Sequence, residues 1–173
     1  PVFDIWMRLL QRVPGSVMWL LQDNASAAAN LQAQAQARGV GPHRLVFAAR
    51  SPLPQHLARH CHADLFLDTV PCNAHTTTSD ALWAGLPVLT CQGNTFAGRV
   101  AASLLHAAGM PELITYSLEA YEARAFQLAS QPAELQAIKD RLRAQRGTCS
   151  LFDADAFRLK LESAYQGMYR ERW

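Results

Sequence analysis

Short apolar segments alternate with segments of helical pattern from the start of the chain to Thr90. The apolar segments are rich in Val, Leu and Phe, and each follows a helical one: Val17–Leu21, Leu45–Ala48, Asp64–Asp68 and Val88–Thr90. Strands separated by helical crossovers pair in parallel, and helices then cover both faces of the sheet. The sequence therefore predicts an α/β fold built on a parallel, doubly wound sheet.

The helical segments of this part have recognisable ends. The first is an amphipathic helix over Phe3–Leu10, which stops near Val13–Gly15. The second is rich in alanine and spans about Ala25–Arg38. Ser51 is expected to cap a third helix, which has a proline in its first turn and continues to about His62.

The chain beyond Thr90 is predicted to be helical. Thr95 is expected to cap the next helix, and further helical segments begin near Leu118, Pro132 and Asp153. The last of them carries an apolar stripe at helical spacing, which is usually core but is exposed when its partner surface is missing: Phe157, Leu161, Ala164, Tyr165 and Met168.

Composition narrows the class of protein. Half of the 173 residues are hydrophobic, enough to bury the core of one domain. The net charge of +2, without an aromatic stacking platform, argues against a nucleic-acid binder. The four cysteines form no C-x-x-C pair, which favours reduced thiols in a cytoplasmic protein. No run reaches the roughly 18 apolar residues of a membrane span. Because the chain starts at Pro1 directly in a helical pattern, we expect it to be a fragment.

The polar loop and helix start that precede Val88–Thr90 have the character of a phosphate-binding site. Over His75–Thr78, hydroxyls, an imidazole and unpaired backbone N–H groups meet at the positive end of the helix dipole, which suits an anion. Asp80 lies four residues after Thr76, so its carboxylate is on the same helix face as the threonines and can accept hydrogen bonds from sugar hydroxyls. Ligands of doubly wound sheets bind beyond the carboxyl ends of the strands, where Ser51–His56 also falls.

Other kinds of site are less well supported. The chain has neither G-x-G-x-x-G nor G-x-x-x-x-G-K-[ST], which argues against NAD-type dehydrogenases and P-loop NTPases. Three histidines and a cysteine within His56–His62 could form a metal cluster, but no second ligand group has regular spacing. Asp68 could pair with Asp80 as acid and base, yet a carboxylate at a strand end more often forms a turn. We therefore assign Asp68 no chemistry.

Three segments together resemble the C-terminal catalytic lobe of the O-GlcNAc transferases, the protein O-linked N-acetylglucosaminyltransferase family. They are SVMWLL, HADLFLDTVPCNAHTTTSDALWAGLPVLT and TFAGRVAASLL, and the most specific string within them is CNAHTTTSDALWAG at Cys72–Gly85. The family has the GT-B architecture of two Rossmann-like lobes, of which the second binds most of the nucleotide sugar. The resemblance implies that residues 1–173 form this second lobe, as a single nucleotide-sugar-binding lobe whose C-terminal helix, 153–173, crosses to the first lobe.

The resemblance also implies a UDP site. Ser51 begins the loop that meets the uracil, His56 matches the histidine that stacks on the base, and Arg59 matches the basic residue one turn later. Asp80 matches the acid that holds the ribose.

The remaining matches concern the phosphates and the sugar. His75, Thr76 and Thr77 match the residues that touch the pyrophosphate. Cys72 lies where the family's loop approaches the N-acetyl group of the sugar.

The chain departs from the family pattern in three positions. Leu53 stands where a lysine that contacts the ribose is common, which weakens the expectation of nucleotide affinity. Thr78 and Ser79 replace a glycine and a methionine of some relatives. The phosphate-facing lysine, the first strand of the lobe, the catalytic-lobe histidines and the family's helical (TPR) repeats are expected upstream of Pro1.

The function implied is the UDP-binding half of an inverting glycosyltransferase that moves N-acetylglucosamine from UDP-GlcNAc to Ser or Thr hydroxyls of proteins. The fragment would hold no catalytic base and be inactive alone, while His75, Thr76 and Thr77 stabilise the departing diphosphate without a metal or other cofactor. Upstream regions would bind the protein acceptor, and neither nucleic acid nor membrane is expected as a partner. Two alternatives stay open: a GT-B transferase with another nucleotide sugar or a non-protein acceptor, and a non-catalytic nucleotide-sensing scaffold, which Leu53 favours.

Overall fold

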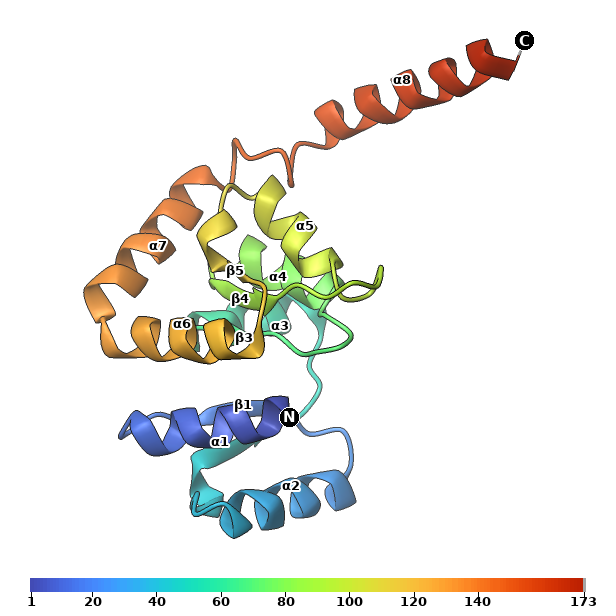
Figure 1. The fold of residues 1–173 in the computed structure, drawn as a ribbon. Coiled ribbons are helices and arrows are strands. Elements are labelled where there is room, and N and C mark those ends of the chain that lie inside the picture. The colour runs from blue at the N-terminus through green and yellow to red at the C-terminus, as the bar shows by residue number, and fades with distance from the viewer. Residues whose placement is uncertain (173) are drawn as a thin grey trace.

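The computed structural model describes residues 1–172 and shows an alternating α/β fold (Figure 1). The strands are β1 Met18–Leu21, β2 Leu45–Ala48, β3 Phe66–Leu67, β4 Val88–Cys91 and β5 Ile114–Thr115. The helices are α1 Val2–Arg12, α2 Ala25–Ala37, α3 Leu53–Arg59, α4 Thr76–Trp83, α5 Val100–Ala107, α6 Leu118–Ser130, α7 Pro132–Gln145 and α8 Ala154–Arg172. Short 3₁₀ helices lie at Pro42–Arg44, His60–His62 and Pro111–Leu113.

All strand pairs are parallel, as the helical crossovers predict. β1 pairs with β2 along its whole length. β4 lies between β3 and β5, with Val88 opposite Phe66 and Thr90 opposite Ile114. Within residues 1–172, β1 and β3 are not hydrogen-bonded to each other, so the parallel sheet is in two parts.

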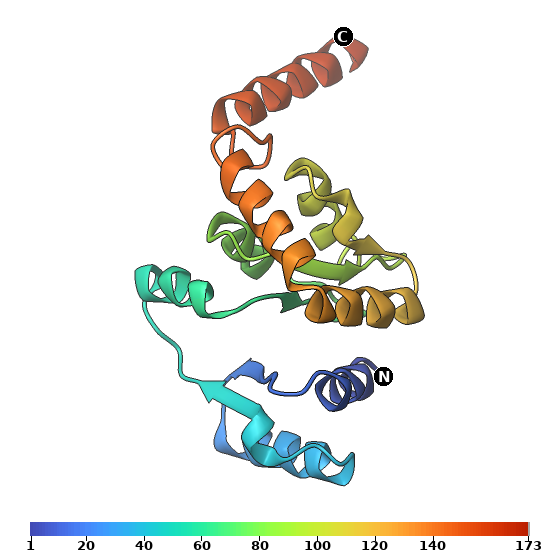
Figure 2. The same ribbon diagram turned by 90° about the vertical axis from the view of Figure 1, so that its left-hand side faces the viewer.

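Two clusters of buried side chains hold the layers together, and α6 contributes to both. One cluster surrounds β4, whose four residues are all buried, and joins it to α4, α5, α6 and α7. The other joins α1, β1 and β2 to the opposite side of α6. In the second cluster, Trp6 Nε1 donates to Tyr121 Oη at 3.2 Å, and Tyr121 Oη donates to Asp68 O at 2.9 Å. Because α6 packs on α1 and on β4, it connects the two parts of the sheet (Figures 1 and 2).

The strands differ from the prediction in number and length. β5 was not predicted, because two residues are too few to show a period. β3 covers only Phe66–Leu67 of the predicted Asp64–Asp68. It pairs on one side only, with β4, and the paired residues are Phe66 opposite Val88 and Leu67 opposite Leu89.

Two predicted helix caps were wrong. Pro52, not Ser51, is the N-cap of α3, because the first helical hydrogen bond runs from His56 N to Pro52 O, at 2.9 Å. Arg99 is the N-cap of α5. Thr95 instead caps a turn upstream of that helix, where its Oγ1 accepts a hydrogen bond from Gly98 N at 3.1 Å.

The last helix extends away from the other elements in both views (Figure 2). None of its described residues is buried, and its apolar stripe is exposed, as predicted for a helix without its partner surface: Phe157, Leu161, Ala164, Tyr165 and Met168. No helix in the part of the chain that the structure describes combines the length and apolar character of a membrane span.

Candidate functional site

The amino end of α4 lies beyond the carboxyl end of β3, at the edge of the sheet where ligands of such folds bind. His75 is the N-cap residue, and its carbonyl oxygen accepts from the amides of Thr78 and Ser79 at 3.1 and 3.2 Å. The amides of Thr76 and Thr77 have no acceptor among residues 1–172, and both side chains are exposed. Two N–H groups and two hydroxyls are therefore available to an anion at the positive end of the helix dipole.

Asp68 fixes the loop that leads from β3 into α4. Its Oδ1 accepts hydrogen bonds from Thr69 N at 2.8 Å and Ala74 N at 2.7 Å, and its Oδ2 accepts one from Thr90 Oγ1 at 2.6 Å. Burial raises the pKa of this carboxyl, which is only 1% exposed, and the hydrogen bonds from Thr90, Ala74 and Thr69 oppose that rise. The turn-forming role expected for Asp68 is confirmed.

A second loop, Gly93–Arg99, packs across the first. Asn73 N donates to Ala97 O at 2.9 Å, and the same oxygen lies 3.5 Å from Nε2 of His75. Phe96, in the middle of this second loop, places its ring edge-to-face with the imidazole, with 6.1 Å between the ring centroids and 89° between the planes. The second loop therefore positions the His75 side chain.

α3 brings His56 next to α4. His56 Nε2 lies 4.0 Å from Asp80 Oδ2, and Arg59 Nη2 donates to His56 Nδ1 at 2.8 Å. Because an arginine donates to Nδ1, the ring proton of the neutral imidazole is on Nε2 and faces the carboxylate. Burial lowers the pKa of His56, and the nearby His60 and Arg59 lower it further. A second arginine nitrogen, Nη1, donates to Ala49 O at 2.8 Å, which fixes the guanidinium beside the end of β2.

The other predicted residues lie on the loops around the pair formed by His56 and Asp80. Ser51 is partly buried between β2 and α3, and Leu53, the first residue of α3, is 60% exposed. Cys72 is exposed in the loop before α4, and its Sγ lies 3.7 Å from Asn73 O. The structure therefore brings His56 and Asp80 together beside the start of α4, and no hydrogen bond or ion pair joins Ser51 or Cys72 to these two side chains.

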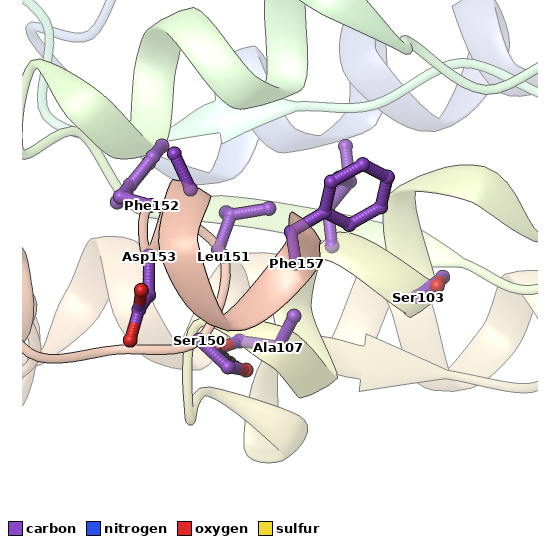
Figure 3. Close-up of a pocket in the computed structure, with 9 residues that line it drawn as sticks. Ser103, Ala107, Ser150, Leu151, Phe152, Asp153 and Phe157 are labelled. Atoms are coloured by element: carbon purple, nitrogen blue, oxygen red, sulfur yellow. Dashed lines mark hydrogen bonds between the residues drawn. The ribbon is translucent and has the colours of Figure 1, made fainter. Parts of the chain in front are cut away.

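Two other kinds of site can be separated from this one. Among the described residues, no three His, Cys, Asp or Glu side chains lie together so as to hold a metal ion, and this includes the segment His56–His62. A cavity of about 470 Å³ lies between α5 and the start of α8, lined mainly by apolar side chains (Figure 3): Leu104, Leu151, Phe152 and Phe157. None of the predicted binding residues lines it.

The sequence indicated a loop before the helix at Val100, but it did not show that this second loop packs on the site. Its available signal was the pair of glycines that close it, since Gly93 N donates to Gly98 O at 2.7 Å. Such a pair indicates a tight turn, but it does not say which segment the turn will pack against.

The fold and the site together indicate the class of protein. A parallel α/β lobe is typical of nucleotide-binding proteins when the carboxyl ends of its strands meet a helix start with free amides and a carboxylate one turn further on. A family model described as glycosyl transferase family 41 matches residues 1–161. The chain belongs to this family, and the family prediction made from the sequence is confirmed.

Similar proteins cover nearly the whole chain. A probable UDP-N-acetylglucosamine–peptide N-acetylglucosaminyltransferase, SEC, of Arabidopsis thaliana is 40% identical over 169 residues, which are 97% of this chain and 17% of that protein. The UDP-N-acetylglucosamine–peptide N-acetylglucosaminyltransferase of Caenorhabditis elegans is 32% identical over 96% of this chain and 14% of its own length. A structure of a mutant O-GlcNAc transferase of Thermobaculum terrenum superposes with a TM-score of 0.92 and 32% identity, over 98% of this chain and 33% of that one. The chain thus spans less than a fifth of these two relatives and a third of the solved structure.

Proposed function

We propose that this chain is the UDP-binding half of an inverting glycosyltransferase that moves N-acetylglucosamine from UDP-GlcNAc to Ser or Thr hydroxyls of proteins. The observation that carries the proposal is the free amino end of α4, with the amides and hydroxyls of Thr76 and Thr77 unpaired within residues 1–172, in a chain of family 41. The names of the relatives, which are peptide N-acetylglucosaminyltransferases, support the donor and the acceptor.

The phosphates of the donor would bind at this helix end. Negative charge grows on the diphosphate as the glycosidic bond breaks. Fixed amides and hydroxyls at a positive helix end therefore stabilise the transition state more than the ground state. His75 is held at the same place by the second loop, so its imidazole can meet the phosphates. These groups act without a metal, and the attacking hydroxyl and its base would come from outside residues 1–173.

The nucleoside would bind toward α3. His56 presents a neutral ring that can stack on a base, and Asp80 presents a carboxylate that can accept hydrogen bonds from ribose hydroxyls. Arg59 supports His56 rather than the ligand, because its guanidinium is already bonded to His56 and to Ala49 O. Ser51 and Cys72 would border the uracil and the N-acetyl group respectively.

The arrangement of the whole enzyme is part of the same proposal. Residues 1–173 would form one nucleotide-sugar-binding lobe, with α8 crossing to a first lobe, and the exposed apolar stripe of α8 supports this. Helical TPR repeats and a cytoplasmic location complete the proposed enzyme, and four free cysteines are compatible with that location.

A second function is favoured by one observation. Leu53 places an exposed apolar side chain at the start of α3, where a ribose-contacting cation would strengthen nucleotide binding. A non-catalytic nucleotide-sensing scaffold would tolerate that loss.

Two substitutions test the assignment of roles. His75→Ala should weaken UDP about tenfold and leave uridine nearly unchanged, because the imidazole meets phosphate. Asp80→Ala should weaken both ligands, because the carboxylate meets ribose. Isothermal titration calorimetry measures both affinities, with the exposed residues His106 and Asp155 changed to alanine as matched controls. Equal losses for both ligands in both variants would contradict the assignment.

A further inference from the structure

Phe96 is exposed to an unusual degree for an aromatic residue in a well-fixed loop. Its side chain is 77% exposed, more than any other large hydrophobic residue in the described part of the chain. Single exposed apolar residues are common on protein surfaces, so exposure alone indicates nothing. Phe96, however, lies beside His75, so its exposed ring is part of the candidate site.

The loop that carries Phe96 is closed by its own hydrogen bonds. Gly93 N donates to Gly98 O at 2.7 Å, Gly98 N to Thr95 Oγ1 at 3.1 Å, and Arg99 N to Phe96 O at 3.0 Å. A Cβ at Gly98 would lie only 3.0 Å from the carbonyl oxygen of Pro71, so this loop sits directly on the loop that precedes α4. The Phe96 ring is therefore presented from a supported backbone.

The residues of the site follow one another in a fixed order. His56 contacts Asp80, Asp80 shares a helix face with Thr76 one turn nearer the amino end of α4, and His75 caps that end. Phe96 packs edge-to-face against the imidazole of His75. If His56 marks the base and Asp80 the ribose, the diphosphate lies at the helix end, and the group attached beyond the diphosphate reaches Phe96.

We propose that Phe96 is a specificity-determining residue that packs against the hexose ring of the nucleotide sugar. A pyranose has an apolar face of C–H groups, and the negatively polarised face of an aromatic ring suits such partly positive hydrogens. A mostly apolar wall with a few polar groups beside it is also the usual construction of a small-molecule site. The inference rests on the proposed function, because it needs a UDP-sugar at the start of α4.

The test compares UDP with UDP-GlcNAc in calorimetric titrations of the wild-type protein and of Phe96→Ala, Phe96→Leu and Phe96→Tyr. Phe96→Ala should weaken UDP-GlcNAc about fivefold and leave UDP unchanged. Phe96→Tyr should restore the affinity, because it keeps the aromatic face, whereas Phe96→Leu should restore little. Tyr169→Ala is the matched control, since Tyr169 is 69% exposed on α8.

The outcomes separate this inference from the proposed function. If the wild-type protein binds neither ligand, the proposed function fails and the inference fails with it. If the wild-type protein binds UDP but Phe96→Ala changes neither affinity, or weakens both ligands equally, only the role of Phe96 is overturned.

Discussion

Replacement of Asp68 tests how the site is built without touching any group that would meet the ligand. The carboxylate accepts two backbone hydrogen bonds, from Thr69 and Ala74, which hold the loop that carries His75 to the helix start. A third hydrogen bond joins it to Thr90 on β4. Asp68→Ala removes all three bonds and leaves two backbone N–H groups and a buried hydroxyl without an acceptor.

The size of the effect follows from these contacts. Hydrogen bonds to a charged acceptor are each worth about 1.5–3 kcal/mol, so the three together give at most about 5–9 kcal/mol. The raised pKa of Asp68 means that burial costs the charged form more than the hydrogen bonds return, so the net loss must be smaller. We expect Asp68→Ala to lower the free energy of unfolding by about 2–4 kcal/mol.

Asp68→Asn is the matched variant. Both backbone N–H groups bind the same atom, Oδ1, which asparagine keeps, and the neutral side chain avoids the cost of burying a charge. We expect a loss of about 1 kcal/mol or less in urea denaturation. UDP affinity should fall in Asp68→Ala and be retained in Asp68→Asn. The reasoning is refuted if Asp68→Ala costs less than about 0.5 kcal/mol, or if the two variants are equally destabilised.

Three further predictions concern stability. Tyr121→Phe removes the hydroxyl that donates to Asp68 O and accepts from an indole, and should cost about 1–3 kcal/mol in urea denaturation; a neutral effect would contradict its bridging role. Because the pKa of His56 is lowered from 6.5, the unfolded chain binds the proton first, so stability should fall as the pH drops below 6.5. His56→Asn should reduce that fall in denaturation curves compared between about pH 7.5 and pH 5.5, and an unchanged fall would show that the fall arises elsewhere. Gly98→Ala forces a Cβ against Pro71 O and should lower the thermal midpoint, unlike Gly147→Ala, where the space is open.

The alternation of elements was predictable because each longer strand is a compact apolar run flanked by helix signals. β4 illustrates this, since all four of its residues are buried between helices and its sequence shows no polar alternation. β5 escaped prediction because two residues, Ile114 and Thr115, acquire their strand character only from pairing with β4. The division of the sheet between β1 and β3 is likewise a property of pairing, which no local pattern encodes.

The start of α4 was predictable from the sequence, whereas the contacts that other segments make with it were not. The string His75–Asp80 indicates an N-terminus with hydroxyls and a carboxylate on one face, and α4 starts there. The contact of His56 with Asp80 and the packing of Phe96 on His75 join segments about 20 residues apart, through loops whose course depends on the core beneath them. The doubly wound pattern placed the segment Ser51–His56 at the ligand-binding edge of the sheet, but the base-stacking role of His56 came only from the family resemblance.

The central claim is that the start of α4 binds the diphosphate of a uridine nucleotide. Calorimetric titration of UDP, UMP and uridine into the wild-type protein and into His56→Ala tests it most directly. The account predicts a Kd for UDP between about 1 µM and 1 mM, weaker binding of UMP, still weaker binding of uridine, and a loss of UDP affinity in the variant. Uridine binding as tightly as UDP, or no binding of UDP by the folded protein, would contradict the claim.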